Sequence, residues 1–462
     1  MAAVLCGLLP LALVVGVEDV GRSAAWRLTL ALLVYAGFRL SLLVAAGLPR
    51  LFDFFFWLFC YIFLGLAPTV QIRSGLTART TPGVDPSLDG PAALLVWVGV
   101  LCYELGRGAA VLIERRRRSL GYGVHEGAAT PVRVDRSRTW LLVGFGVAFS
   151  AYFVSRIGVA ALIGSRDAAF AARSATWPDP AVRSIMYALA VYPLLVGIGA
   201  LAQLRGAAER SATRLGYGLA AVAAALLLLT IINPVSSARY SLGTVLFALA
   251  VYAGATSRRL RVRFTLLSTL GGLIFLFPLA DAFRLSTGVN LVRDGFFGEY
   301  QGNPDYDAFW QVANAYTYVL DGLVVRGQQA LGVVLFWVPR SLWPGKPIDS
   351  GILLANYRGY NFTNLSAPLW SEFLLNGGIL VLVVGFVAVG WLLRALDTRL
   401  VPAFAVGGFW AIAGAVFPIY MTILLRGSLL QATGAVTVAA ASLVFVRARA
   451  RTARPPERYP PL

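Results

Sequence analysis

Five basic side chains of this sequence stand in segments that carry little other charge, and their type suits phosphate chemistry. They are Arg239, Arg284, Arg340, Lys346 and Arg426. An arginine presents a permanently charged, planar fork of N–H donors that can bind two phosphate oxygens at once. If these side chains converge in the fold, we expect a site for a lipid-linked phosphate or pyrophosphate. The alternative is that each pairs separately with a nearby aspartate or a lipid headgroup.

The elements that would position these side chains are membrane helices. Of the 462 residues, 58% are hydrophobic and 13% are charged, and the mean hydropathy is +0.72. A typical soluble domain is about a quarter charged, so the composition excludes a cytosolic enzyme, a secreted domain and a disordered chain. We predict an all-α polytopic membrane protein with about 12 transmembrane helices. The apolar runs cover residues 2–17, 26–47, 51–70, 92–113, 139–154, 184–204, 215–232, 240–256, 264–280, 373–393, 401–420 and 429–444.

The basic residues are spread unevenly over the loops between these runs. The chain has 40 Lys and Arg against 22 Asp and Glu, a net charge of +18. One set of alternate loops holds 22 basic residues in about 70 positions, whereas the other holds 15 in about 165. Because Lys and Arg accumulate in cytoplasmic loops, we expect both termini in the cytoplasm and the sparsely basic loops outside. The positive charge is then explained by the orientation of the protein in the membrane, and we expect no nucleic-acid partner.

The chain divides into four parts on this basis. Residues 1–280 would form nine membrane helices, 281–372 one large extracytoplasmic loop with the active site, 373–446 three more helices, and 447–462 a basic, Pro-rich cytoplasmic tail. Inside the loop, aromatic residues at helical spacing over 306–320 and an apolar run over 328–338 predict short amphipathic helices that lie at the membrane surface or pack under the loop. Their aromatic side chains would anchor the loop at the membrane interface, or else form a platform on which sugars stack.

Charged residues inside the apolar runs need partners. Arg39 and Glu104 both fall past the middle of their spans, where an isolated charge is costly. We expect an ion pair that involves Glu104, with Arg39 or with Arg107, which lies one helical turn away. A proton relay is the alternative.

The metal-binding residue types are scarce. Cys6, Cys60 and Cys102 all fall in apolar runs, which indicates buried small side chains. His125 is the single histidine, so a histidine-based metal site is excluded. We expect neither a metal nor a cofactor.

Three segments of the sequence together resemble a known family. Pro339-Arg-Ser-Leu-Trp-Pro-Gly-Lys-Pro347 resembles the PRxxWPxKP signature of bacterial oligosaccharide repeat-unit polymerases, the Wzy or O-antigen polymerase type. The stretch from Ser366 to Gly378 is similar to that family's S…GExxxNFGxxG segment, although Ser371 and Gly377 depart from it. Ser237-Ala-Arg-Tyr240 resembles its S-x-R turn, and Arg426-Gly its late arginine.

The resemblance implies a GT-C-like, metal-independent glycosyltransferase at the outer face of the bacterial cytoplasmic membrane. It would transfer a growing oligosaccharide from a polyprenyl-pyrophosphate carrier to a sugar of a second lipid-linked unit. Arg239, Arg340 and Arg426 would hold the pyrophosphate, and Glu372 would be the base, unless it is a carboxylate paired with one of these arginines. The further substrate-binding residues would be Arg284, Lys346, Arg358, Trp343 and Tyr240. A flippase and a chain-length regulator are the implied protein partners.

Other functions remain open at this point. Glu18 and Asp19 stand where metal-dependent GT-C enzymes carry an acidic pair, which favours a transferase that uses a polyprenyl-phosphate sugar and a divalent cation. The related O-antigen ligases share the layout but rely on a histidine in the large outer loop, and His125 is in a cytoplasmic loop. A flippase or transporter would place its ligand groups near the middle of the membrane, whereas the unexplained polar residues here gather at one face.

Overall fold

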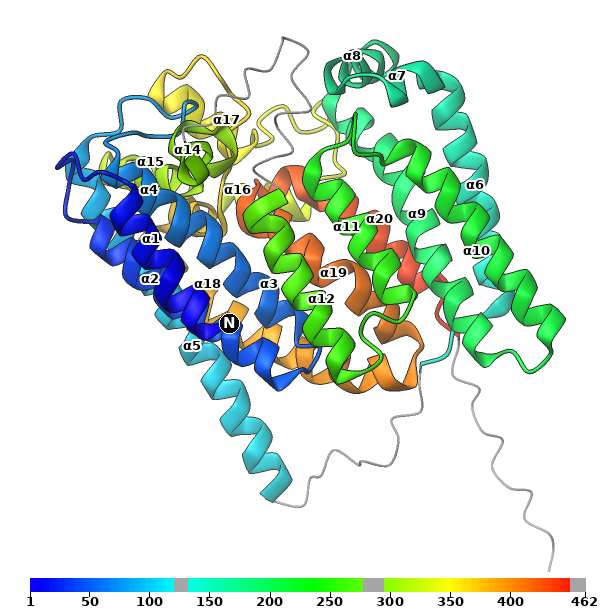
Figure 1. Ribbon diagram of the computed structural model, residues 1–462. Coiled ribbons are helices and arrows are strands. Elements are labelled where there is room, and N and C mark those ends of the chain that lie inside the picture. The colour runs from blue at the N-terminus through cyan, green and yellow to red at the C-terminus, as the bar shows by residue number, and fades with distance from the viewer. Residues whose placement is uncertain (120–131, 277–294, 449–462) are drawn as a thin grey trace, which may run out of the picture.

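Long apolar stretches that fold as helices form the body of the protein. The computed structural model describes residues 1–119, 132–276 and 295–448, and the elements named in these ranges are helices (Figure 1). Eight helical segments are long and apolar enough to cross a membrane. They are α2 (Trp26–Ala46), the continuous helix Leu51–Arg73, the segment Pro86–Arg117, α6 (Arg136–Ile157), α9 (Pro180–Ala207), α10 (Ser211–Ile231), α18 (Leu369–Val406) and α19 (Phe409–Arg426). The protein is therefore a helical, multi-pass membrane protein.

Helices also occupy the remaining apolar runs. Shorter ones cover Ala3–Gly16, α11 (Arg239–Tyr252) and α20 (Leu429–Phe445), and α12 (Arg259–Gly271) continues into the π-helical turn η4 (Gly272–Leu276). The run 264–280 ends outside the described residues. That all twelve runs cross the membrane stays a prediction.

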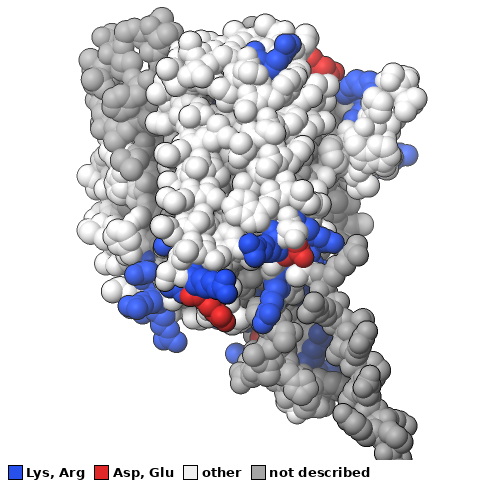
Figure 2. All heavy atoms as spheres, turned by 90° about the vertical axis from the view of Figure 1, so that its right-hand side faces the viewer, with Lys and Arg blue, Asp and Glu red and all other residues white. Residues whose placement is uncertain are grey.

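The molecule has an uncharged belt between two charged ends. Figure 2 shows this on one face, where Lys and Arg gather mainly towards the lower end and the middle is free of charged residues. The short helices gather at the opposite, upper end in Figure 1. They are α7 (Val159–Ile163), α8 (Arg166–Thr176), α14 (Gly295–Gly302), the 3₁₀ turn η5 (Pro304–Tyr306), α15 (Ala308–Leu320), α16 (Gln328–Val334) and α17 (Ser350–Arg358).

The helices expected over 306–320 and 328–338 are present as α15 and α16. The first is packed into the core, and its buried aromatic side chains have neither of the two expected roles. Phe309 and Trp310 of α15 are fully buried. The indole N–H of Trp310 donates to the Gln71 side chain at 2.7 Å. These two side chains are therefore core residues of the upper end, and neither anchors the loop at the interface nor offers a surface to a sugar.

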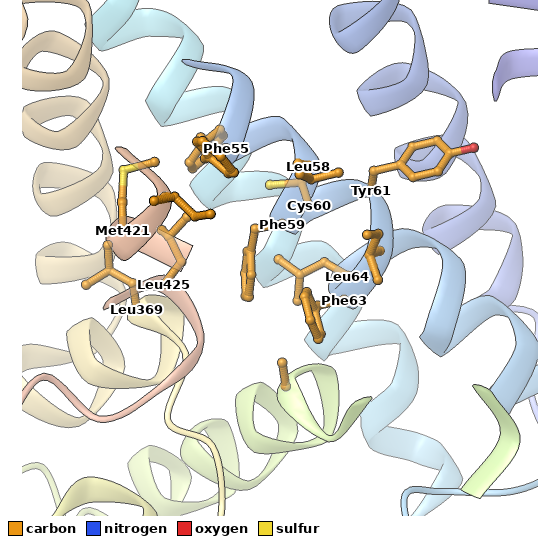
Figure 3. Packing of buried hydrophobic residues seen from close by; sticks show 14 of the residues in the cluster. Phe55, Leu58, Phe59, Cys60, Tyr61, Phe63, Leu64, Leu369, Met421 and Leu425 are labelled. Carbon is orange, nitrogen blue, oxygen red and sulfur yellow. The ribbon is translucent and has the colours of Figure 1, made fainter. Parts of the chain in front are cut away.

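The helix Leu51–Arg73 is the axis of the fold. It consists of α3 (Leu51–Phe59), the π-helical segment η2 (Cys60–Leu66) and α4 (Ala67–Arg73), and it is buried on all sides. A helix that is hydrophobic all round is expected in such a position. Figure 3 shows its aromatic side chains, including Phe55, Phe59 and Phe63, with Met421 and Leu425 of α19 on one side.

Glycines bring α5 (Asp89–Ser119) and α18 into close contact. A Cβ atom on Gly106 would lie 1.9 Å from the Val387 carbonyl oxygen, and one on Gly390 would lie 2.0 Å from the Tyr103 carbonyl oxygen. Neither position has room for a side chain. These two helices therefore connect the upper and lower ends of the molecule as one tightly packed pair.

The expected ion pair is confirmed, and it is larger than predicted. The Glu104 carboxylate forms ion pairs with Arg39 at 2.9 Å and with Arg107 at 2.7 Å, so both candidate partners are used. Arg39 also lies 3.6 Å from Asp53 on the central helix. Asp53 in turn accepts from the Trp57 indole at 2.9 Å and the Tyr103 hydroxyl at 2.8 Å. This network fixes α2, α3 and α5 to one another.

Breaking this network should show coupling between its members. Arg39→Gln and Glu104→Gln should each lower the free energy of unfolding by about 3 kcal/mol, because each removes a charge that balances other largely buried charges of the network. The double variant should lose less than the sum by about 1 kcal/mol or more. Unfolding of the purified protein in detergent measures this, with the exposed Glu209→Gln as control. Strictly additive losses would reject the pairing.

Candidate functional site

Two of the arginines singled out in the sequence converge on one carboxylate at the upper end. The Arg239 guanidinium lies 3.7 Å from Asp305, and that of Arg426 lies 3.5 Å from Asp305 and 3.6 Å from Asp307. Arg426 also donates from Nε to the Asp305 backbone carbonyl at 3.0 Å. We call these four residues the Asp305 cluster.

The members of the Asp305 cluster are positioned at or next to the ends of helices. Arg239 is the first residue of α11, and Arg426 is the last residue of α19. Asp305 lies in η5, whose start is capped by the Asn303 side chain. The Arg426 guanidinium also lies over the Phe63 ring of the central helix, 5.9 Å from its centroid. The site is therefore assembled from segments that are distant in the sequence, above the axis of the fold.

Asp307 forms the buried floor of the cluster. Its side chain is 2% exposed and accepts from the Ser366 backbone N–H at 3.0 Å. Burial raises the pKa of Asp307, and the nearby Arg426 guanidinium partly opposes this. The next residue, Ala367, donates its N–H to the Arg426 carbonyl at 3.0 Å. The chain entering α18 is thus attached to the same site.

The pairs in the Asp305 cluster are loose compared with another ion pair at this end. Arg22 binds Asp89 through two contacts of 3.0 and 3.1 Å, and the Asp89 side chain is fully buried. Asp305 is instead 37% exposed, and its side-chain contacts with the arginines are 3.5–3.7 Å long. Good charge-assisted hydrogen bonds are about 2.7–2.9 Å long. A stronger anion could therefore take the place of Asp305 between the two arginines.

Glu372 lies beside this cluster but has different partners from those expected. Its carboxylate accepts from the Ser350 hydroxyl at 3.0 Å and from the Leu429 backbone N–H at 2.9 Å. Glu372 is 1% exposed. The turn from Arg426 to Leu429 thus links the two groups. Its first residue, Arg426, contacts the aspartates, and its last residue, Leu429, binds Glu372. In this structure Glu372 joins the starts of α17, α18 and α20, rather than pairing with an arginine.

The Pro339–Pro347 segment folds on itself. Arg340 donates to the Lys346 and Pro347 carbonyls at 2.7 and 3.0 Å, and the Lys346 ammonium donates to the Phe336 and Val338 carbonyls at 2.6 and 2.8 Å. Arg340 is exposed, whereas Trp343 and Lys346 are half-buried. These bonds hold the segment as a compact loop, and the contacts described for Arg340 lie within it rather than in the Asp305 cluster.

The other expected substrate-binding residues are placed separately. Arg358, near the end of α17, donates to the Gly83 carbonyl at 3.1 Å. Tyr240, next to Arg239, is 48% exposed. Arg284 and His125 lie outside the described residues.

In the acidic pair near the first helix, Asp19 is engaged in structural contacts and Glu18 is exposed. Asp19 lies 3.7 Å from Arg73, and it accepts from the Gly21 backbone N–H at 3.1 Å. Among the described residues, no group of three or more His, Cys, Asp or Glu side chains could hold a metal ion.

Sequence reasoning missed Asp305 and Asp307. The local signal was present, because Asn303-Pro-Asp305-Tyr-Asp307 lies just before the start of α15 and combines a proline with three residues, Asn and Asp, of types that favour helix starts. This pattern predicts a helix start, but nothing in it shows that arginines 66 residues upstream and 121 residues downstream would meet there.

Comparison with other proteins adds no family to these observations. No protein-family model, no curated protein and no solved structure matches this chain. The resemblance described above therefore stays a prediction, and the function is inferred from the site.

The raised pKa of Asp307 predicts how stability depends on pH. A carboxyl with a raised pKa in the folded state contributes most below its unfolded pKa, and that contribution is lost as the pH rises through the folded pKa. The wild-type protein should therefore lose stability relative to Asp307→Asn as the pH rises from about 4. Thermal unfolding of both proteins across this range measures the difference, and a constant difference would contradict the prediction.

Proposed function

We propose that this protein is a membrane glycan polymerase that acts on polyprenyl-pyrophosphate-linked oligosaccharides at the face carrying the Asp305 cluster. The observation that carries the proposal is the convergence of Arg239 and Arg426 on a partly exposed carboxylate through loose contacts. The resemblance of the Pro339–Pro347 and Ser366–Gly378 segments to repeat-unit polymerases supports the same reaction. In this proposal the face is extracytoplasmic and both termini are cytoplasmic.

The proposed reaction requires stabilisation of a diphosphate leaving group. The acceptor hydroxyl oxygen forms a bond to the anomeric carbon of the donor glycan, and the bond from that carbon to the diphosphate oxygen breaks. The polyprenyl diphosphate leaves with the electron pair, and the hydroxyl proton passes to a base. Negative charge grows on the leaving group, and two guanidinium groups held at helix ends would stabilise it.

In the proposed mechanism, the diphosphate displaces Asp305 from the two arginines. A diphosphate carries more negative charge than a carboxylate and offers more acceptor oxygens. It therefore competes well with Asp305 for the guanidinium groups of both arginines. Asp305 can turn away because it is partly exposed, whereas the buried Asp307 keeps Arg426 in position. The aspartates would hold the arginines in place between turnovers.

Arg340 and Lys346 have a less direct place in this proposal. Their bonds to carbonyl groups stabilise the Pro339–Pro347 loop. Arg340 is exposed at its surface, where it and the half-buried Trp343 could contact the sugar or the phosphate of a bound substrate. We therefore expect substitution of Arg340 to weaken substrate binding more than it slows the chemical step.

Replacing the arginines of the cluster tests the proposal directly. Arg239→Ala and Arg426→Ala should each lower the rate of polymer formation by about 100-fold or more, because each removes a donor from the developing charge. The measurement is the ladder of glycan lengths made in cells, at matched protein levels. Arg156→Ala is the matched control, because Arg156 is an exposed arginine in the last turn of α6.

Reconstituted vesicles separate this function from its alternatives. A polymerase lengthens a labelled lipid-linked glycan, whereas a flippase moves it across the bilayer without lengthening it. Turnover that stops on addition of a chelator would favour the metal-dependent transferase, and unchanged turnover would favour the polymerase. Wild-type ladders from both arginine variants would leave the proposal without support.

The role of Glu372 can be separated from its structural contacts. Glu372→Gln retains an acceptor for the Leu429 N–H and should fold normally, whereas Glu372→Ala should lose about 1–3 kcal/mol because it leaves buried donors unpaired. If Glu372 is the base, Glu372→Gln should slow polymerisation by about 100-fold or more at wild-type protein levels. Glycan ladders and thermal unfolding measure the two effects, and a normal ladder from Glu372→Gln would exclude the base role.

A further inference from the structure

A second concentration of arginines lies at the opposite, lower end of the molecule. A cavity of about 290 Å³ is lined by Arg50, Arg107, Val111, Glu114, Arg115 and Arg394. Four guanidinium groups thus face one cavity together with a single carboxylate. Its walls come from the lower part of α5, the start of the central helix and the lower part of α18 (Figure 1).

The charges around this cavity are only partly balanced. Arg394 pairs with Glu114 at 2.8 Å, and Arg107 is engaged by Glu104 at 2.7 Å. Arg50 is different, because in the part of the chain that the structure describes its half-buried guanidinium has neither an ion pair nor a hydrogen bond. Burial and the neighbouring Arg394 lower the pKa of Arg50, and Asp53 and Asp397 only partly oppose this. An anion in the cavity would relieve this repulsion.

We propose that this cavity binds the phosphate group of an anionic phospholipid headgroup from the membrane leaflet at the basic face. Arginine favours phosphate oxygens over other common anions because its planar fork matches their geometry. A basic cavity between helices, at the end of a membrane protein where basic residues are dense, is where such headgroups bind. This site is separate from the Asp305 cluster and does not depend on the proposed function.

The source of the phosphate follows from the position of the cavity. It opens among the ends of membrane helices, beside the arginine run Arg115-Arg-Arg-Arg118, where headgroups are present at high local concentration. A soluble phosphate compound would use the same guanidinium groups, so the experiment must distinguish the two sources.

Thermal unfolding of the full-length protein in detergent tests the proposal, with three probes: short-chain phosphatidylglycerol, short-chain phosphatidylcholine and inorganic phosphate. Phosphatidylglycerol should raise the unfolding temperature in a saturable manner, and the other two should not. Arg50→Gln should weaken this binding by about tenfold or more, the loss expected for one charge-assisted hydrogen bond. Arg50→Lys, which keeps the charge, should lose less.

Arg116→Gln is the matched control, because Arg116 is an exposed neighbour of the cavity that does not line it. It should bind phosphatidylglycerol like the wild type. Arg50→Gln should unfold at the wild-type temperature without lipid, since it breaks no ion pair. Equal binding by wild type and Arg50→Gln would overturn the proposal. Saturable stabilisation by inorganic phosphate that matches phosphatidylglycerol would overturn the assignment to a lipid headgroup.

Discussion

A charge that is buried between membrane helices needs a partner in direct contact, because no water is there to solvate it. This constraint determines how the helices of this molecule pack against one another. The central helix Leu51–Arg73 illustrates it, because it is buried on all sides and still carries charges near both ends. Asp53 is held by Arg39, Trp57 and Tyr103. At the other end, Arg73 donates to the Val14 and Val17 carbonyls at the end of the first helix. Each charge thereby fixes a neighbouring helix.

The same constraint separates structural ion pairs from the site that we assign to chemistry. Short, two-pronged contacts such as that between Arg22 and Asp89 lock two elements together and leave nothing for a ligand. The contacts of Arg239 and Arg426 with Asp305 are longer and partly open to solvent. The difference lies in geometry rather than in residue type. In the proposed function, the long contacts of these two arginines with the Asp305 carboxylate are what distinguish them from the arginines of structural ion pairs.

Much of the fold could be predicted from the sequence, because hydrophobic runs of membrane length have few alternatives to a helix. The pairing of Glu104 also followed, since a lone charge inside such a run demands a partner. The partners of Glu372 could not be predicted, because Ser350 and the Leu429 N–H reach it only through the packing of three helices. Nor could the internal bonds of Arg340, which depend on how the Pro339–Pro347 segment turns. The contacts of Asp305 and Asp307 with the arginines could not be predicted either, because a local turn motif does not show which distant residues will pack against it.

The break in α18 has a practical consequence for protein engineering. Gly377 and Gly378 leave the helical conformation, and Gly378 adopts a φ of +65°, which suits glycine. The eight residues before this break bind the preceding segment of short helices through Asn376, whose side chain accepts from the Ala330 N–H. A chimera that exchanges this segment between related chains should therefore be joined after Gly378 rather than at Leu369. A joint at Leu369 would leave Glu372 and Asn376 behind and separate them from the loop to which they are attached.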